Sequence, residues 1–97
     1  MTKHPRNDLD KELTAPLRLS IVAALAGVGE AEYRAIRDAV ETNDAELSRQ
    51  LTRLSDAGYV KITKTRAGRY AKTWLAITPS GRNALKSHVA ALKAITG

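Results

Sequence analysis

The spacing of apolar residues over the first sixty positions predicts three amphipathic helices. The first begins at Pro16, because proline is favoured in the first helical turn, with Thr14 as a candidate N-terminal cap. Gly27 and Gly29 end this helix, and its apolar face carries Leu17, Ile21, Ala24, Leu25 and Val28. Residues 9–13 are compatible with an extra helical turn, and residues 1–8 are interpreted as a flexible, solvated tail.

A short second helix is expected over residues 33–40 and a third over residues 44–57. The apolar face of the second helix holds Tyr33, Ile36, Ala39 and Val40. In the third helix Leu47, Leu51 and Leu54 recur on one face, and Gly58 follows as a left-handed cap. The link between the two helices is polar, and Asp44 is expected to cap the third. Two helices joined by so short a link are typical of a helix-turn-helix.

The hydrophobic period then shortens to about 2, which predicts a two-stranded hairpin. Val60 and Ile62 alternate with polar residues in a first strand over residues 59–66, so one face is expected to be buried. A turn over residues 67–69 leads to a second strand over residues 70–78. We expect Trp74, Tyr33 and Tyr59 to pack in the core, with the tyrosine hydroxyls at its wet edge.

A last helix is predicted from Ser80 to about Ile95, after Pro79. One side of it carries Leu85, Val89, Leu92 and Ile95, which need a partner. That partner is either the first helix of the same chain or the same helix of a second copy, and we favour the second copy. The chain is thus expected to be a single α+β, mainly helical domain over residues 1–97, with residues 79–97 as a dimerisation helix.

Charge is divided unevenly along a chain of 97 residues whose net charge is +6. Residues 1–56 hold all ten acidic residues beside eight Lys and Arg, whereas residues 57–97 hold eight Lys and Arg and no acidic residue. A basic half of this kind indicates a polyanionic partner. Charge alone does not distinguish DNA from RNA or an anionic membrane.

Several chemistries have no candidate residues in the sequence. There is no Cys, which excludes disulfides and thiolate metal sites and favours a cytoplasmic location. No segment has the length of a membrane span or the pattern of a signal peptide. His4 and His88 are the only histidines and have no ligand-spaced partners, so no metal, cofactor or catalytic site is expected and the chain is not expected to be an enzyme.

From residue 9 to the last helix the chain resembles small single-domain winged helix-turn-helix regulators of the MarR/ArsR type. The resemblance is carried by residues 16–25 (PLRLSIVAAL), residues 47–60 (LSRQLTRLSDAGYV) and residues 72–82 (KTWLAITPSGR). It implies a three-helix core, a two-stranded basic wing and a C-terminal dimerisation helix. It also implies sequence-specific binding of double-stranded DNA by a homodimer that regulates transcription.

In such a fold the exposed face of the third helix enters the major groove. Arg49 is suited to the O6/N7 edge of guanine and Gln50 to adenine, whereas Ser48, Thr52 and Arg53 are placed for phosphates. Glu46 is compatible either with base reading or with a salt bridge to Arg49. The predicted contact set on this helix is Ala45, Glu46, Ser48, Arg49, Gln50, Thr52 and Arg53.

The hairpin is the second predicted DNA contact. Arg66 and Arg69 flank Gly68 at its tip, where they could enter a minor groove or hold the backbone. The alternative is a charged strand edge that only resists aggregation. The predicted contact set on the wing is Lys61, Lys64, Arg66, Arg69, Tyr70 and Lys72.

We therefore expect a dimeric DNA-binding transcriptional regulator that reads a palindromic or pseudopalindromic operator and has no membrane partner. A winged-helix module for protein interaction is the alternative, because a fold does not dictate function. Binding of structured RNA is a weaker third option. The sequence identifies no small-molecule effector.

Overall fold

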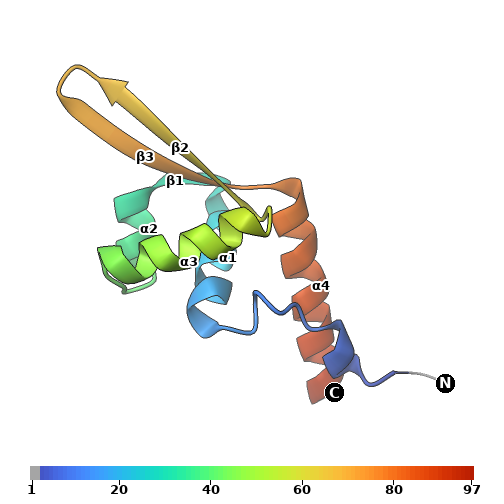
Figure 1. The fold of residues 1–97 in the computed structure, drawn as a ribbon. Coiled ribbons are helices and arrows are strands. Elements are labelled where there is room, and N and C mark those ends of the chain that lie inside the picture. Colours follow the sequence, from blue (N-terminus) through green and yellow to red (C-terminus); the bar gives the residue numbers. More distant parts are fainter. Residues whose placement is uncertain (1–2) are drawn as a thin grey trace.

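The computed structural model describes residues 3–97, which form a mainly helical fold with one antiparallel sheet of three strands. The elements, in chain order, are the 3₁₀ helix η1 (Pro5–Asp8), α1 (Pro16–Val28), β1 (Glu30–Glu32), α2 (Tyr33–Ala39), α3 (Asp44–Asp56), β2 (Val60–Ala67), β3 (Tyr70–Ile77) and α4 (Pro79–Thr96). Three helices form a body, from which the β2–β3 hairpin projects on one side and α4 runs along another (Figure 1). This arrangement confirms the predicted α+β, mainly helical class.

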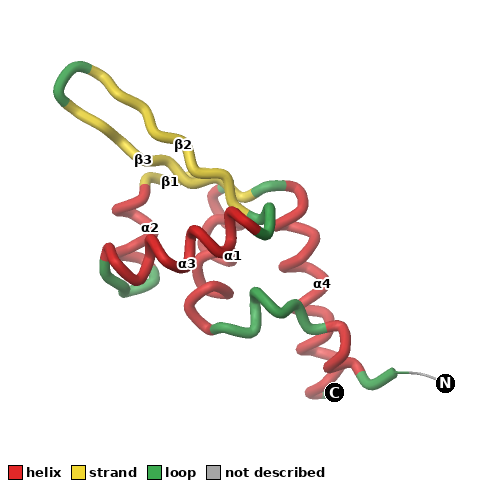
Figure 2. The backbone as a smooth tube through the Cα atoms, viewed as in Figure 1, coloured by secondary structure: helices red, strands yellow, loops and turns green. Residues whose placement is uncertain are grey.

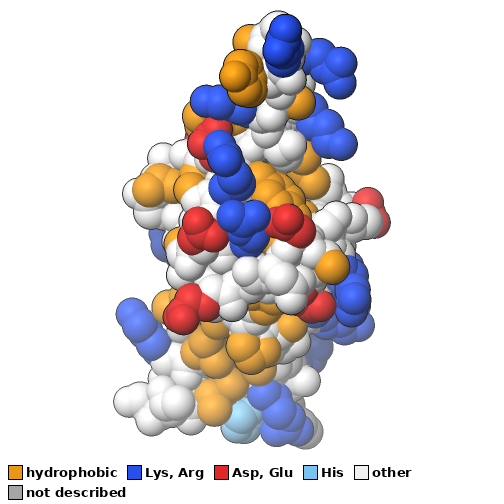
Figure 3. Space-filling view, turned by 90° about the vertical axis from the view of Figure 1, so that its left-hand side faces the viewer, with side chains coloured by type: hydrophobic (Ala, Val, Ile, Leu, Met, Phe, Trp, Pro, Cys, Tyr) orange, Lys and Arg blue, Asp and Glu red, His pale blue; other side chains and the backbone are white. Residues whose placement is uncertain are grey.

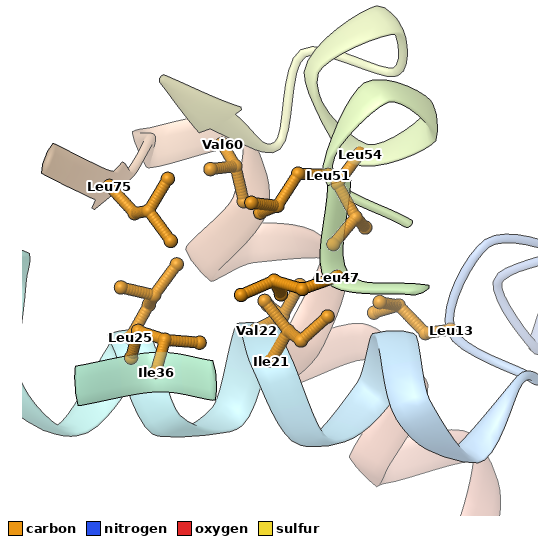
Figure 4. Packing of buried hydrophobic residues seen from close by; sticks show 10 residues of the cluster. All are labelled: Leu13, Ile21, Val22, Leu25, Ile36, Leu47, Leu51, Leu54, Val60 and Leu75. Atoms are coloured by element: carbon orange, nitrogen blue, oxygen red, sulfur yellow. The ribbon is translucent and has the colours of Figure 1, made fainter. Parts of the chain in front are cut away.

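The core lies between α1, α2, α3 and the base of the sheet (Figure 4). Leu47, Leu51 and Leu54 of α3 are at most 2% exposed, as their spacing predicted. They pack with Leu13, Ile21, Val22, Leu25, Ile36, Val60 and Leu75. Burying a side chain of this size stabilises the fold by roughly 1.5–3 kcal/mol. Because α3 turns its leucines inward, its opposite face lies at the surface.

Strand β1 was not predicted from the sequence. Gly29, with φ 82°, turns the chain out of α1, and its carbonyl accepts a hydrogen bond of 3.1 Å from the N–H of Ile77. The strand then pairs antiparallel with residues 74–76 of β3, which makes the strand order β1-β3-β2. Two of its three residues are glutamates, which are depleted in strands. Strand β1 therefore forms because β3 is available to pair with it, and the sequence of residues 30–32 alone does not predict a strand.

The β2–β3 hairpin extends well beyond the helical body (Figure 2). The predicted buried face of the first strand is wrong beyond Val60, since Ile62 is 37% exposed and residues 63–67 are all exposed. The outer part of the hairpin extends beyond the helices, so no helix covers it. The prediction for Trp74 is also wrong: this side chain is half-buried outside the core cluster, because Leu75 occupies the inward face of β3.

Two helix caps differ from those predicted. The residue before α1 is Ala15, which has no capping side chain, and the hydroxyl of Thr14 donates instead to the carbonyl of Lys11. Helix α3 is capped by Asn43, whose Oδ1 accepts from the N–H of Glu46 at 2.8 Å. Asp44 is already the first residue of that helix, so its carboxylate is free to pair with a neighbouring element. On α2, Ala39 is exposed and does not share the buried face of Ile36.

The N-terminal segment packs on α4 and is ordered there, so the tail predicted for residues 1–8 is wrong for Pro5–Asp8, which form η1. Residues 1–2 of that prediction lie outside the described residues. The extra helical turn suggested for residues 9–13 is a hydrogen-bonded turn instead. In it, the carboxylate of Asp10 accepts from the N–H groups of Glu12 and Leu13.

Helix α4 is joined to the rest of the fold at its N-terminus and at its middle. Thr78 caps it by accepting from the N–H of Gly81, and Gly81 lies so close to the Tyr59 carbonyl that an added Cβ would overlap that oxygen. At the middle of the helix, the buried imidazole of His88 accepts at Nδ1 from the N–H of Asp10 at 3.0 Å. His88 is therefore structural, as expected for an isolated histidine.

Candidate nucleic-acid interface

The face of α3 opposite its leucines carries the predicted major-groove contacts. Five of the seven are exposed: Ala45, Ser48, Arg49, Thr52 and Arg53. Glu46 and Gln50 are half-buried. The arrangement follows from the helical period, because positions between Leu47, Leu51 and Leu54 must point away from the core. The exposed set combines two guanidinium groups with two hydroxyls, which suits both base edges and phosphates.

The two half-buried residues belong to a chain of polar contacts that starts inside the protein. Arg18 of α1 is 9% exposed, and its Nη1 donates to Oε1 of Gln50 at 2.7 Å. The Nε2 of Gln50 then donates to Oε1 of Glu46 at 2.8 Å. The other oxygen of Glu46, Oε2, lies 3.4 Å from Nη1 of Arg49. Of the two interpretations kept for Glu46, the structure contains the salt bridge to Arg49.

The second arginine of α3 is held by the segment that precedes α1. The Nε and Nη2 of Arg53 donate to the two carboxylate oxygens of Glu12, at 3.2 and 3.3 Å. The same carboxylate lies 3.5 Å from Nε of Arg18, which donates to the backbone carbonyl of Glu12 at 2.7 Å. Glu12 therefore binds the guanidinium group of Arg53, which was predicted to contact a phosphate.

The wing carries its cations at the surface. Lys61, Lys64, Arg66, Arg69 and Lys72 are all exposed, as is Tyr70 beside the tip. Gly68 at the tip has a φ of 60°, which favours glycine and permits the tight turn. Lys72 alone of these cations pairs within the described residues, with Glu32 of β1 at 3.4 Å. In Figure 3, Lys and Arg side chains dominate the wing, whereas acidic and basic side chains alternate over the helices.

Helix α3 and the wing border a common groove of about 310 Å³. Ser48 and Thr52 line it from the helix, and Lys64 and Thr73 line it from the wing. Its floor is formed by Tyr33, Leu51 and Ile62. The two predicted contact surfaces are therefore adjacent parts of one face of the molecule.

The start of α3 is fixed from α2. Arg37 donates to the carboxylates of Asp38 and Asp44, at 3.1 and 2.9 Å. The hydroxyl of Tyr33 donates to the carbonyl of Asp44 at 2.8 Å, and burial raises the pKa of that hydroxyl. Asp44 thus joins the two helices of the helix-turn-helix instead of capping the second.

The root of the wing is fixed from the N-terminal segment. The hydroxyl of Tyr59 donates to Oδ2 of Asp10, and this bond raises the pKa of Tyr59 to about 12, with burial as the second cause. Tyr59 and Tyr33 both pack against the core, and in both the polar end is satisfied by the protein. The core prediction for these two tyrosines is confirmed.

The predicted dimer residues lie where α4 leaves the body. Leu85 and Val89 are half-buried, whereas Leu92 and Ile95 are 38% and 39% exposed. Leu85 and Val89 help to line a groove of about 430 Å³ between α4 and the end of α1. A second, mostly apolar groove of about 300 Å³ runs between α4 and residues 9–19, with Leu92 at its edge.

The sequence did not point to Arg18 or Glu12 as parts of this interface. Arg18 occupies a position on α1 between apolar residues, and its partner Gln50 is 32 residues away. Glu12 is 41 residues from Arg53. An arginine within an apolar stretch was the only available signal, because a buried Arg requires an internal partner.

Other kinds of site have little support among residues 3–97. No group of three or more His, Cys, Asp or Glu is placed there to hold a metal ion. Of the helices in that range, none combines the length and apolar character needed to cross a membrane.

Comparison with known proteins gives a consistent result. Residues 17–96 match the model of the winged helix DNA-binding domain family. A curated relative, an uncharacterized protein of Methanocaldococcus jannaschii, is 28% identical over 79 residues, which are 81% of this chain and 86% of that protein.

Solved structures agree with this match. A transcriptional regulator homologue of Pyrococcus horikoshii is similar with a TM-score of 0.88 and 25% identity, over 98% of this chain and 95% of that one. A MarR-family regulator of Silicibacter pomeroyi, 21% identical, shares the fold with a TM-score of 0.68 over 95% of this chain and 64% of that one. The family match covers most of the chain and includes α3 and the wing. The chain therefore belongs to the winged helix DNA-binding domain family.

Proposed function

We propose that the chain binds a palindromic or pseudopalindromic operator in double-stranded DNA as a homodimer. In this proposal α3 lies in the major groove and the wing contacts the adjacent backbone or minor groove. Arg49 reads a base edge, Ser48, Thr52 and Arg53 position the helix on phosphates, and the wing cations supply electrostatic affinity.

The observation that carries the proposal is the single groove shared by α3 and the wing. Hydroxyl groups from both elements and the cation Lys64 of the wing border it, and no buried side-chain nitrogen or oxygen within the described residues is left without a partner. Arg49 and Arg53 lie on the exposed face of the same helix, where they pair with Glu46 and Glu12. A module for protein interaction has no need for Arg49, Arg53 and a cationic hairpin on one face.

The dimer is supported by the course of α4. The apolar face of this helix continues past the body to Leu92 and Ile95, and apolar grooves flank it on both sides. Pairing of two α4 helices, over residues 79–97, would bury these side chains about a two-fold axis. Two copies of α3 would then face half-sites about 10 base pairs apart.

Selection from a random duplex DNA library with the full chain tests the proposal. We expect enrichment of a motif with two inverted half-sites spaced by about one helical turn. Absence of any enriched motif would contradict specific DNA binding, and a single unrepeated half-site would contradict the dimer. A duplex RNA competitor of matched sequence is expected to displace the DNA poorly; strong displacement would favour an RNA-binding module instead.

A further inference from the structure

The polar chain that begins at Arg18 ends on the residue best placed to read DNA. It passes from α1 through Gln50 and Glu46 to Arg49, over contacts of 2.7, 2.8 and 3.4 Å. Its first member is buried, and the side chain of its last member is 71% exposed. Orientation is thus transmitted from the interior of the body to the surface of α3.

Each contact in this chain fixes the next one. A guanidinium group has only donors and a carboxylate has only acceptors, so the amide oxygen of Gln50 must face Arg18 and its NH₂ group must face Glu46. With Oε1 of Glu46 held in this way, Oε2 is presented to Arg49. Arg18 itself is fixed by the carbonyl and carboxylate of Glu12.

An isolated, exposed ion pair between Glu46 and Arg49 would do little to order either side chain. Here the glutamate is half-buried and bonded on its inner side, so it provides a fixed point for the arginine. The contact uses one terminal nitrogen of Arg49, and the remaining N–H groups stay available for the two acceptors, O6 and N7, on the edge of a guanine. An arginine held in place before binding loses less side-chain entropy when it docks.

We propose that Arg18, Gln50 and Glu46 are positioning residues that orient Arg49 toward a guanine in the operator. The inference deepens the proposed function and rests on it. It also gives Gln50 a different role from the adenine contact suggested by the sequence, because both ends of its amide are engaged inside the protein.

The test compares two duplexes that differ at one base pair. The parent duplex comes from library selection with the wild-type chain, and the base pair is the one at which Arg49→Ala loses discrimination. Gln50→Met keeps the length of the side chain and removes both hydrogen bonds. We expect it to reduce the ratio of the two dissociation constants by about 3- to 10-fold at that same base pair, with binding to random DNA unchanged.

Lys64→Met is the matched control, an exposed cation of the wing that has no contact with the residues of the chain leading to Arg49. It is expected to weaken binding to both duplexes equally and to leave their ratio unchanged. Arg18→Met, which touches no DNA, is expected to reproduce the loss seen in Gln50→Met, and Arg18→Lys to restore part of it. Thermal unfolding of each variant separates this effect from a loss of folding.

Two results would overturn the inference. One is a ratio for Gln50→Met within twofold of wild type. The other is a loss at a different, A·T base pair, which would make Gln50 a direct reader of adenine. Failure of the proposed function is a separate outcome, since the wild-type chain would then select no motif at all.

Discussion

Glu12 holds Arg53 through both of its carboxylate oxygens, at 3.2 and 3.3 Å, on the surface that is proposed to face DNA. A carboxylate in this position stands where a phosphate would bind, and the two anions compete for one guanidinium group. In the free protein Arg53 is therefore paired with Glu12, and this ion pair has to break before Arg53 can bind a phosphate.

The first prediction concerns this competition. Glu12→Gln is expected to raise the affinity for duplex DNA by about 2- to 5-fold, because Arg53 no longer leaves an ion pair to reach a phosphate. Fluorescence anisotropy at fixed salt measures the change. Asp56→Asn removes the same charge from the end of α3, where no ion pair forms with a described residue, and serves as control. An equal gain in both variants would indicate a change in net charge alone.

The second prediction concerns the wing tip. Each phosphate contact releases counterions when the protein binds DNA. Replacing Arg66 and Arg69 by Ala removes two such contacts, so the slope of log affinity against log salt should become shallower by about 2 per bound protomer. Salt titrations of wild type and variant give the two slopes. Arg34→Ala, an exposed cation of α2, is the control for loss of charge away from the tip. Unchanged slopes in the double variant would remove the wing tip from the interface.

The third prediction concerns the bond between Tyr59 and Asp10. The pKa of Tyr59 is raised to about 12 in the folded protein, from an ordinary value of 10.0. The neutral phenol is thus favoured by folding, and its contribution is complete below pH 10 and lost as the pH rises toward 12. Tyr59→Phe should lower the free energy of unfolding at pH 7 by about 1 kcal/mol.

Urea unfolding of both proteins between pH 7 and pH 11.5 checks this assignment. The difference in free energy of unfolding between wild type and Tyr59→Phe should shrink above about pH 10. Because other groups titrate equally in both proteins, they cancel in the difference. A constant difference over that range would show that the hydrogen bond does not control the titration.

The fourth prediction concerns the surface of α4. Leu92→Lys combined with Ile95→Lys should convert the proposed dimer to a monomer, since charges would enter the apolar contact proposed between the two helices. Sedimentation equilibrium measures the mass. Asn83→Lys places a charge on an exposed position of the same helix and should leave the dimer intact. A dimer that persists in the double variant would place the interface elsewhere on the molecule.

The helices and the wing could be predicted from the sequence because their signals are local. Leu47, Leu51 and Leu54 define both the buried face of α3 and, by subtraction, the face that carries Arg49 and Arg53. The hairpin was visible from its change of period and from Gly68. Both features depend on residues that are close in the chain.

The features that were missed depend on contacts between distant residues. Strand β1 exists because β3 offers it a partner, and η1 is ordered because α4 lies beside it. The positions of Gln50 and Arg53 could not be derived from α3 alone, because their partners Arg18 and Glu12 come from other segments. The prediction for Trp74 was wrong for a related reason. The pairing of β3 with β1 and β2 determines which of its faces points to the core, and that face carries Leu75.

The central claim is that the exposed face of α3 reads DNA. The most direct test measures how tightly a variant with Arg49→Ala and Arg53→Ala binds the selected duplex. Fluorescence anisotropy should show a dissociation constant about 100-fold above that of wild type, given roughly 1–3 kcal/mol for a base contact and a further loss for the phosphate contact. The melting temperature should stay unchanged, because both side chains are exposed. A folded double variant that binds the duplex as tightly as wild type would contradict the claim.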